Sequence, residues 1–490
     1  MKFLRYITIA FVSLLVIFLG VGRSPAQATP ALHYTELEFA PPPEIQVPEY
    51  TQFELENGIV VYLMEDHELP LVGGTALFHT GERMEPGDQV GLASITGAVM
   101  RTGGTLAHPP EALNQLLEDR AAAVETSVDT TAASVSFDAL SEDLDTVFDL
   151  FADVIRRPAF AQDRIDLLKN QYRGAIARRN DSPDDIADRE FQKLIYGEES
   201  PYARTVEFAT LENISRPAIA SFYERYYHPQ GMLLGIVGDF DSDTMRSQIE
   251  SAFGDWQTPP DAVTAIEPTL PEVIQAKQGG VFLVDQPQLT QSYVQLGHLD
   301  GTFASPDFPA LSVLNDVMNG LGGRLVNQVR SRQGLAYVVY AFWSPRFDYP
   351  GIFVGGGQTR SEATVPFIRS ILDELETVRQ SPVTEDELKR AKDSVLNSFI
   401  FSFQTPSQVL SRVLRYDYYD YPADFIFQYQ KAVEEVTVED VLRVAQTYLQ
   451  PDQIVTLVVG NAAAIDPPLT TLAPGTTVTP IDITIPQIGG

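Results

Sequence analysis

Hydrophobic and polar positions along this chain group into short strand-like runs and longer helix-like runs. Two runs near the start, 53–56 and 59–62, flank Asn57-Gly58. That dipeptide best supplies two positive φ angles, so the pattern predicts a β-hairpin that opens an α+β domain. Further along, the apolar runs 232–237 and 352–354 predict buried strands.

Polar residues mark where the helices between these strands begin. Thr384 and Glu387 form a capping-box sequence, in which each side chain can bind the backbone amide of the other residue. Thr437 and Ser141 precede helix-like runs with similar but less complete signals. Strands alternating with long helices predict layers, with a sheet on one side and helices on the other.

The two halves of the chain resemble each other. The segment 227–238 recurs loosely at 448–460, with Pro451 following Pro229 and Gly460 following Gly238 by the same 222 residues. Segment 94–100 pairs with 312–318, and a Gly-Gly pair recurs at nearly the same offset. These coincidences predict a duplicated domain of about 220 residues.

The predicted fold class is therefore α+β, with two homologous α/β sandwich lobes. Each lobe is expected to be a mostly antiparallel sheet with helices packed on one side. A passage rich in proline and poor in periodic pattern is predicted to link the lobes. The expected boundaries are 51–256 for the first lobe, 257–278 for the linker, 279–463 for the second lobe and 464–490 for a Pro/Thr-rich tail.

The first 28 residues differ in kind from the rest. Lys2 and Arg5 precede an apolar run, 7–21, and Ala26-Gln27-Ala28 supplies a small-x-small cleavage site. This pattern predicts a signal peptide over 1–28, followed by an extension over 29–50, in a protein that is periplasmic or secreted. An uncleaved anchor is the alternative, but the run is short for a hydrocarbon layer of about 30 Å. No later segment predicts membrane insertion.

Composition mainly excludes functions. With 44% hydrophobic residues, the chain can bury a large core. It has no cysteine, which excludes disulfides and thiol nucleophiles. A formal net charge of −32 argues against nucleic acid as a partner.

Common catalytic signatures are missing from the sequence, including a phosphate-binding Gly-Lys loop and a Gly-x-Ser-x-Gly elbow. No two of the six histidines lie within five residues of each other, whereas zinc sites usually take two histidines one helical turn apart. We interpret all six as surface or turn residues rather than ligands: His33, His67, His79, His108, His228 and His298.

The stretch from Thr80-Gly81-Glu82-Arg83 through Gly91-Leu92-Ala93 to Gly103-Gly104-Thr105 resembles the opening of the insulinase and pitrilysin zinc peptidases, which carry an inverted zinc motif. The resemblance spans nearly the whole chain after the predicted signal peptide. It continues through Asn57-Gly58, Asp181-Ser182-Pro183, Tyr196-Gly197, Pro201-Tyr202, the 227–238 strand and the second lobe.

In that family, a helix after Gly-Leu-Ala carries His-x-x-Glu-His, whose histidines bind zinc and whose glutamate acts as the base. The corresponding residues here are Ser94, Gly97 and Ala98, and the family's third ligand, a glutamate, corresponds to Ala175. The resemblance therefore implies that this chain holds no metal or other cofactor of its own.

The family also places an arginine and, seven residues later, a tyrosine opposite the zinc. Arg330 and Tyr337 match this pair, with Gly334-Leu335-Ala336 between them. From the residues alone, Arg330 would be a solvated helix-end cation and Tyr337 a half-buried strand aromatic. The resemblance gives both a catalytic role, with Tyr337 donating to the oxyanion and Arg330 to a neighbouring substrate carbonyl.

Three hypotheses follow. In the first, this chain is the non-metal subunit of an exported heteromeric zinc peptidase that acts on peptides or unfolded proteins, and a sister chain of the same fold carries the zinc. In the second, it is an inert peptide-binding or scaffold protein. In the third, it is a lone metallopeptidase with unconventional ligands.

Overall fold

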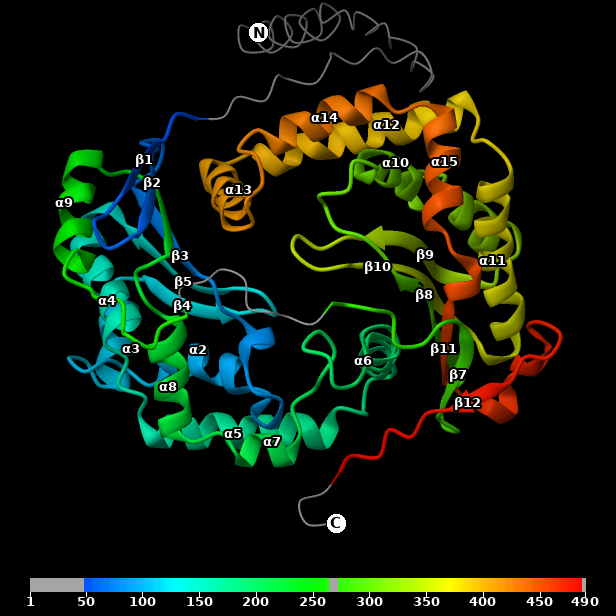
Figure 1. The fold of residues 1–490 in the computed structure, drawn as a ribbon, viewed down its shortest axis with the longest axis horizontal. Coiled ribbons are helices and arrows are strands. Elements are labelled where there is room, and N and C mark those ends of the chain that lie inside the picture. The colour runs from blue at the N-terminus through cyan, green and yellow to red at the C-terminus, as the bar shows by residue number, and fades with distance from the viewer. Residues whose placement is uncertain (1–47, 264–271, 487–490) are drawn as a thin grey trace, which may run out of the picture. The chain divides into compact units, whose positions relative to one another are not determined.

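The computed structural model describes residues 48–263 and 272–486 (Figure 1). The predicted signal peptide, most of the predicted extension and residues 264–271 of the predicted linker lie outside the described residues. Within the described ranges, no helix is both long and apolar enough to cross a membrane.

The first lobe contains one sheet and a set of helices. In chain order its elements are β1 (Thr51–Glu54), β2 (Val60–Glu65), β3 (Leu71–Phe78), α2 (Leu92–Thr102), α3 (Pro110–Glu118), β4 (Ala123–Val128), β5 (Ala133–Leu140), α4 (Leu144–Arg156), α5 (Gln162–Arg178), α6 (Pro183–Tyr196), α7 (Phe208–Glu212), α8 (Arg216–Tyr226), β6 (Leu233–Gly238) and α9 (Ser242–Phe253).

The second lobe repeats this plan with changes in its helices. Its elements are β7 (Gly280–Asp285), β8 (Gln291–Leu299), α10 (Phe308–Asn319), the π-helix η5 (Val326–Arg332), β9 (Ala336–Ser344), β10 (Ile352–Arg360), α11 (Thr364–Gln380), α12 (Glu385–Ile400), α13 (Pro406–Tyr418), α14 (Phe425–Glu435), α15 (Val438–Tyr448), β11 (Val455–Gly460) and β12 (Val478–Pro480).

The two sheets share one topology, which confirms the predicted duplication. Their strand orders are β1-β2-β6-β3-β5-β4 and β12-β7-β11-β8-β10-β9. Five strands correspond in sequence order, and both sheets are mixed, because β2 pairs with β6, and β7 with β11, in parallel. The outermost strand differs: β1 precedes its neighbour in the chain, whereas β12 comes from the C-terminal tail and pairs in parallel with β7.

The repeated sequence segments occupy equivalent places. Helix α8 leads to β6 and α15 leads to β11, and both strands end at a glycine. The segments 94–100 and 312–318 fall inside α2 and α10.

The predicted hairpin forms, with Phe53 opposite Val61. Only Gly58 takes a positive φ, of 91°, so the prediction of two positive angles is wrong at Asn57. The reason is a longer loop, closed by a hydrogen bond from the Leu55 amide to the Ile59 carbonyl at 2.9 Å. The side-chain amide of Asn57 donates to the backbone carbonyl of Phe253 at 2.8 Å, which ties the loop to α9.

Two of the three predicted helix starts are confirmed. Thr384 and Glu387 form a reciprocal capping box on α12, and Thr437 forms one with Asp440 on α15. The prediction for Ser141 is wrong, because Ser141–Asp143 forms a 3-10 turn before α4 and provides no cap. The hydroxyl of Ser141 donates instead to Asp239, at 3.0 Å.

Each sheet is covered on its second face by a helix from the other half of the chain. Along β6, Leu234 and Ile236 belong to the first-lobe core, while Leu233 and Val237 pack against α13. Successive side chains of a strand point to opposite faces, so β6 is buried on both. At Gly235 an added Cβ would lie only 2.5 Å from Leu414 of α13, which shows how close the helix comes.

Helix α6 of the first half does the same for the second sheet. Val458 of β11 belongs to the second-lobe core, while Leu457 and Val459 pack with Phe191 and Ile195 of α6. Helix α6 contacts β8 and β11, and α13 contacts β2 and β6 (Figure 1). The expectation of helices on one side of each sheet thus describes each half alone, and the exchanged helices supply the other side.

Polar contacts add to this exchange. The guanidinium of Arg83 pairs with the carboxylate of Asp348 at 2.6 Å, and both side chains are largely buried. The hydroxyl of Tyr196 in α6 donates to the carbonyl of Pro350 at 2.8 Å.

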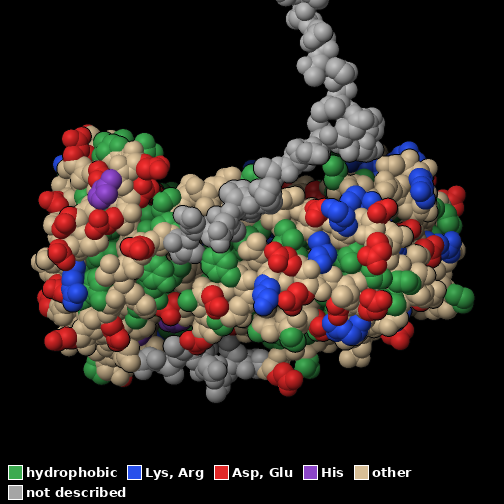
Figure 2. All heavy atoms as spheres, turned by 90° about the horizontal axis from the view of Figure 1, so that it is seen from above, with side chains coloured by type: hydrophobic (Ala, Val, Ile, Leu, Met, Phe, Trp, Pro, Cys, Tyr) green, Lys and Arg blue, Asp and Glu red, His purple; other side chains and the backbone are tan. Residues whose placement is uncertain are grey.

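Asp and Glu side chains are spread over the face seen in Figure 2, as the net charge of −32 leads one to expect.

Candidate functional site

Helix α2, which carries the three positions that match the family's zinc motif, begins in an unusual way. Its N-cap is Gly91 with a φ of 102°, and no side chain at the cap binds the free amides. The buried carboxylate of Glu85 does so instead, accepting from the amides of Gly91 at 3.0 Å and Ala93 at 2.9 Å. Burial raises the pKa of Glu85 to about 7, and the amide hydrogen bonds oppose that rise. Sequence reasoning missed Glu85 because it lies before the helix.

The positions of the family's metal ligands hold no side chain suited to zinc. The hydroxyl of Ser94 donates to Glu82 at 2.8 Å, and Ala98 follows one turn later. Ala175 is exposed on α5, which contacts α2. A hydroxyl already in use and two methyl groups do not provide the imidazole or carboxylate donors that zinc takes, so these residues do not fit the ion.

The position of the catalytic glutamate is filled from the neighbouring strand. An added Cβ on Gly97 would lie 2.5 Å from Cγ2 of Val128, which ends β4. Real side chains do not tolerate such a contact, so Val128 has to move before any larger residue fits at position 97. The loss of the base is therefore built into the packing of α2 against β4.

The structure brings Arg330 and Tyr337 together. Arg330 lies in η5, and the chain turns through Gly334, at a φ of 62°, into β9, where Tyr337 is the second residue. The guanidinium carbon of Arg330 lies 4.6 Å from the centre of the Tyr337 ring, in a cation–π contact. Tyr337 is 79% exposed rather than half-buried, so its hydroxyl is open to a ligand.

The degenerate zinc positions and this pair lie on different lobes. Within residues 48–263 and 272–486, no hydrogen bond or ion pair joins Arg330 or Tyr337 to α2. Tyr337 lies in β9, the edge strand of the second sheet, and Arg330 lies in η5, which packs against β9. Helix α2 packs on β4, the edge strand of the first sheet.

The histidines do not gather into a ligand set. In the described part of the chain, no group of three His, Cys, Asp or Glu side chains is placed to hold a metal ion. The interpretation of all six as surface or turn residues is wrong for His298, which is fully buried in β8 and is satisfied by the amide of Gln450 at 3.3 Å. Because β8 is covered on both faces, its polar residues are buried with it. His33 lies outside the described residues.

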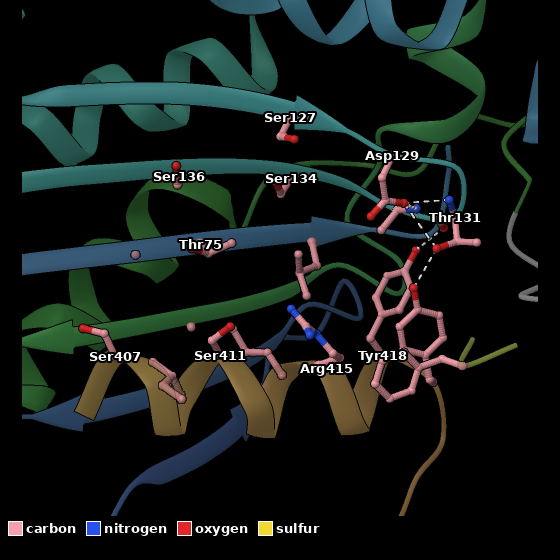
Figure 3. Close-up of a pocket in the computed structure, with 18 of the residues that line it drawn as sticks. Thr75, Ser127, Asp129, Thr131, Ser134, Ser136, Ser407, Ser411, Arg415 and Tyr418 are labelled. Atoms are coloured by element: carbon pink, nitrogen blue, oxygen red, sulfur yellow. Dashed lines mark hydrogen bonds between the residues drawn. The ribbon is translucent and has the colours of Figure 1, made fainter. Parts of the chain in front are cut away.

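A cavity of about 660 Å³ lies between the first sheet and α13 (Figure 3). Sequence reasoning missed it, because its lining comes from four strands, the β4–β5 turn, the β9–β10 loop and α13. Among the lining residues are Thr75, Ser127, Ser134 and Ser136 on the strands and Ser407, Ser411 and Arg415 on α13.

Comparison with known proteins agrees with the duplicated fold. The family model described as insulinase (peptidase family M16) matches residues 63–204, and the peptidase M16 inactive domain matches residues 213–395. A protein of Mycobacterium tuberculosis described as an uncharacterized zinc protease is 28% identical over 320 residues, which cover 63% of this chain and 70% of that one.

Solved structures share the same architecture. The peptidase M16 inactive domain from Pseudomonas fluorescens superposes with a TM-score of 0.75 at 22% identity, covering 86% of this chain and 100% of that one. The periplasmic protease PqqL from Escherichia coli gives a TM-score of 0.70 at 15% identity, covering 87% of this chain and 47% of that one. Two lobes of this topology define an insulinase-like protein. The chain belongs to the insulinase family, peptidase family M16.

Proposed function

We propose that this chain is the non-metal subunit of an exported, heteromeric zinc peptidase, and that it lends Arg330 and Tyr337 to the zinc site of a sister chain. The contact of these two side chains at 4.6 Å, with the tyrosine exposed, is the observation that carries the proposal. The pattern over residues 1–28 and the periplasmic location of PqqL support export.

The chemistry of peptide hydrolysis suits this pair. Attack on the peptide carbonyl creates an oxyanion, and one donor aimed at that charge is worth about 3 kcal/mol in a water-poor site. The hydroxyl of Tyr337 supplies such a donor. The guanidinium of Arg330 lies against the tyrosine ring, which restrains its position. No residue in the described ranges accepts a hydrogen bond from its N–H groups, so they are available to a substrate carbonyl.

The residues of α2 and α5 at the positions of the family's zinc site support the need for a partner. Ser94, Ala98 and Ala175 offer no ligand for zinc, and Gly97 offers no base. A second chain of the same fold with intact His-x-x-Glu-His would provide both, and its zinc would activate the attacking water. The substrate is then a peptide or unfolded protein held between the two chains.

Turnover by the reconstituted pair tests this proposal. The chain is mixed with a zinc-bearing family member from the same organism, and hydrolysis of a quenched fluorescent peptide is followed. Tyr337→Phe should lower kcat by about a hundredfold. Tyr340→Phe, three residues along β9, is the matched control and should leave kcat unchanged. Equal turnover by the Tyr337→Phe variant and the wild type would remove the proposed role.

An inert peptide-binding or scaffold role is the second candidate. The observation that favours it is the open edge of β4, where Glu125 and Ser127 are exposed and no strand pairs beyond them in the described residues. Such an edge can accept an extended peptide as an added strand. A chain that binds unfolded peptides but stimulates no family peptidase would favour this role over the first.

A further inference from the structure

Helix α13, which comes from the second half of the chain, packs directly on only part of the face of the first sheet that is turned toward it. It packs on the apolar half, where Tyr62, Met64, Leu233 and Val237 lie on β2 and β6. The other half, on β3, β5 and β4, carries small polar residues and is separated from α13 by the cavity of about 660 Å³ (Figure 3). This volume lies within the range of sites that bind small molecules and short peptides, about 300–1,000 Å³.

The second lobe shows that the space between such a sheet face and its covering helix can be filled. In the second sheet the equivalent strands β8 and β9 carry Tyr293, Tyr340 and Phe342 on the face covered by α6, and these rings pack into the cluster around that helix. Tyr340 and Phe342 lie 5.6 Å apart, centre to centre. By strand register, Phe342 takes the place of Ser127, Tyr340 that of Glu125 and Tyr293 that of Gly73. No aromatic ring stands at these positions in the first lobe, so the hollow is a property of that lobe.

The hydroxyls around the cavity are arranged by strand register. Thr75 of β3 lies opposite Ser136 of β5, and Ser134 of β5 lies opposite Ser127 of β4. Ser407 and Ser411 approach from α13, one turn apart. None of these six hydroxyls has a hydrogen-bond partner among the described residues. Several convergent and unused donors and acceptors are typical of a ligand site.

Three carboxylates lie on the cavity wall, and one of them is neutralised by an ion pair. The carboxylate of Asp348 is paired with Arg83, and that of Asp129 accepts from the amides of Thr131 and Ala132, both at 2.7 Å. Asp138 is the remaining carboxylate on the wall, and it is exposed.

Two arginines on the cavity wall, Arg346 and Arg415, have no carboxylate partner among the described residues. Arg415 points from α13 toward the sheet, and its guanidinium carbon lies 5.9 Å from the centre of the Phe347 ring (Figure 3). Asp129 and Asp138 on the same wall balance the two guanidinium charges overall. Arg415 nevertheless faces the hydroxyls with no ion-pair partner among the described residues, so it suits one anionic group of a ligand.

We infer that this cavity binds a short extended peptide, whose C-terminal carboxylate pairs with Arg415 and whose backbone groups bind the serine and threonine hydroxyls. A guanidinium fork matches a carboxylate with two parallel hydrogen bonds. Hydroxyls, which both donate and accept, suit the alternating N–H and C=O groups of a peptide backbone. The choice of a peptide as the bearer of the carboxylate rests on the proposed function.

Binding to the full chain alone, without partner or zinc, tests the inference. The probes are N-acetyl-tetraalanine with a free carboxylate and the same peptide as its C-terminal amide, measured by isothermal titration calorimetry. The acid should bind at least about tenfold more tightly than the amide, because the amide loses a charge-assisted pair. Arg415→Gln should abolish this difference.

Arg412→Gln is the matched control. Arg412 lies on the same helix, donates to the carbonyl of Ser402 at 3.3 Å and does not line the cavity. This variant should retain the preference for the acid. Ser136→Tyr, which fills the cavity from the sheet side, should abolish binding of both peptides, and its circular dichroism spectrum would check that it folds.

Three results would overturn the inference: equal affinity for acid and amide, tight binding retained in Ser136→Tyr, or tight binding of an uncharged trisaccharide with no binding of the peptide. Because the assay contains no peptidase, its outcome is independent of the turnover experiment with Tyr337→Phe. Loss of turnover there with no peptide binding here would leave the proposed function in place and reject this site.

Discussion

The hydroxyl of Tyr418 lies 3.0 Å from the carbonyl oxygen of Phe78, a residue 340 positions earlier in the chain. The same hydroxyl lies 2.8 Å from the carbonyl oxygen of Thr131. Tyr418 is only 4% exposed, so water does not replace it as a donor. This buried contact joins the end of α13 to β3 and to the β4–β5 turn, where the exchanged helix meets the first sheet.

Tyr418→Phe should lower the free energy of unfolding by about 1–3 kcal/mol, because it leaves a buried carbonyl without its donor. Urea denaturation followed by circular dichroism measures the change. Tyr337→Phe, which removes an exposed hydroxyl, is the control and should alter stability by less than about 0.5 kcal/mol. Equal stability of Tyr418→Phe and the wild type would show that this contact contributes nothing to the lobe junction.

Two glycines should respond in opposite ways to alanine. Gly235→Ala places a Cβ 2.5 Å from Leu414, so α13 or its leucine has to shift, at a cost of about 1–3 kcal/mol. Gly174→Ala, inside α5, meets no atom within 4 Å and should stabilise the chain by about 0.5–1 kcal/mol through helix propensity. Melting temperatures that move in the same direction for both variants would contradict the close packing of α13.

Acid should destabilise the chain partly through His79. Burial lowers the pKa of this side chain from 6.5 to about 4, outweighing the nearby carboxylate of Asp420, and its ring stacks on Tyr418 at 4.2 Å. The unfolded chain then takes up a proton between pH 6.5 and pH 4 that the folded chain does not. The contribution of His79 to the free energy of unfolding is therefore fully present above pH 6.5. It declines as the pH falls from 6.5 to 4, by about 3 kcal/mol at most.

His79→Phe keeps the stacked ring and removes the proton site, so its stability should fall less than that of the wild type as the pH drops from 6.5 to 4. Glu85, whose pKa is raised to about 7, acts in the opposite direction between pH 4.5 and pH 7. Only the difference between the variant and the wild type isolates His79. Parallel stability curves in urea titrations over this range would reject the assignment.

Restoring the family's ligands tests why this chain lacks them. Ser94→His, Ala98→His and Ala175→Glu together should create a zinc site on α2 and α5, measurable as bound metal after dialysis. Adding Gly97→Glu should destabilise the protein, because Val128 occupies that space, and Val128→Ala should recover most of the loss. Full stability of the quadruple variant without Val128→Ala would show that the strand does not block the position.

Local patterns foretold the elements of each half better than the contacts between halves. The apolar run of β6 predicts a strand buried on both faces, and the repeated segments predict a second strand like it. Nothing near residue 233 indicates that α13, which begins at Pro406, covers one of those faces. The partner helix is set by tertiary packing between segments far apart in sequence.

The same reasoning separates the predicted site from the one that was missed. Arg330 and Tyr337 lie seven residues apart, so a family resemblance and a single turn of chain are enough to pair them. The cavity residues Thr75, Ser136 and Ser411 come together only through strand register and the exchanged helix. Serines scattered through a sequence carry no signal of that meeting.

The exchange of α6 and α13 also determines when the chain can finish folding. A ribosome has to release residues through Tyr418 before the first sheet receives its cover, so the nascent first half exposes the apolar face around Leu233 and Val237 until that point. A truncation at the linker would leave both fragments with such a face, and copies could capture each other's helices. The shortest segment that can complete the first lobe thus ends deep within the second half.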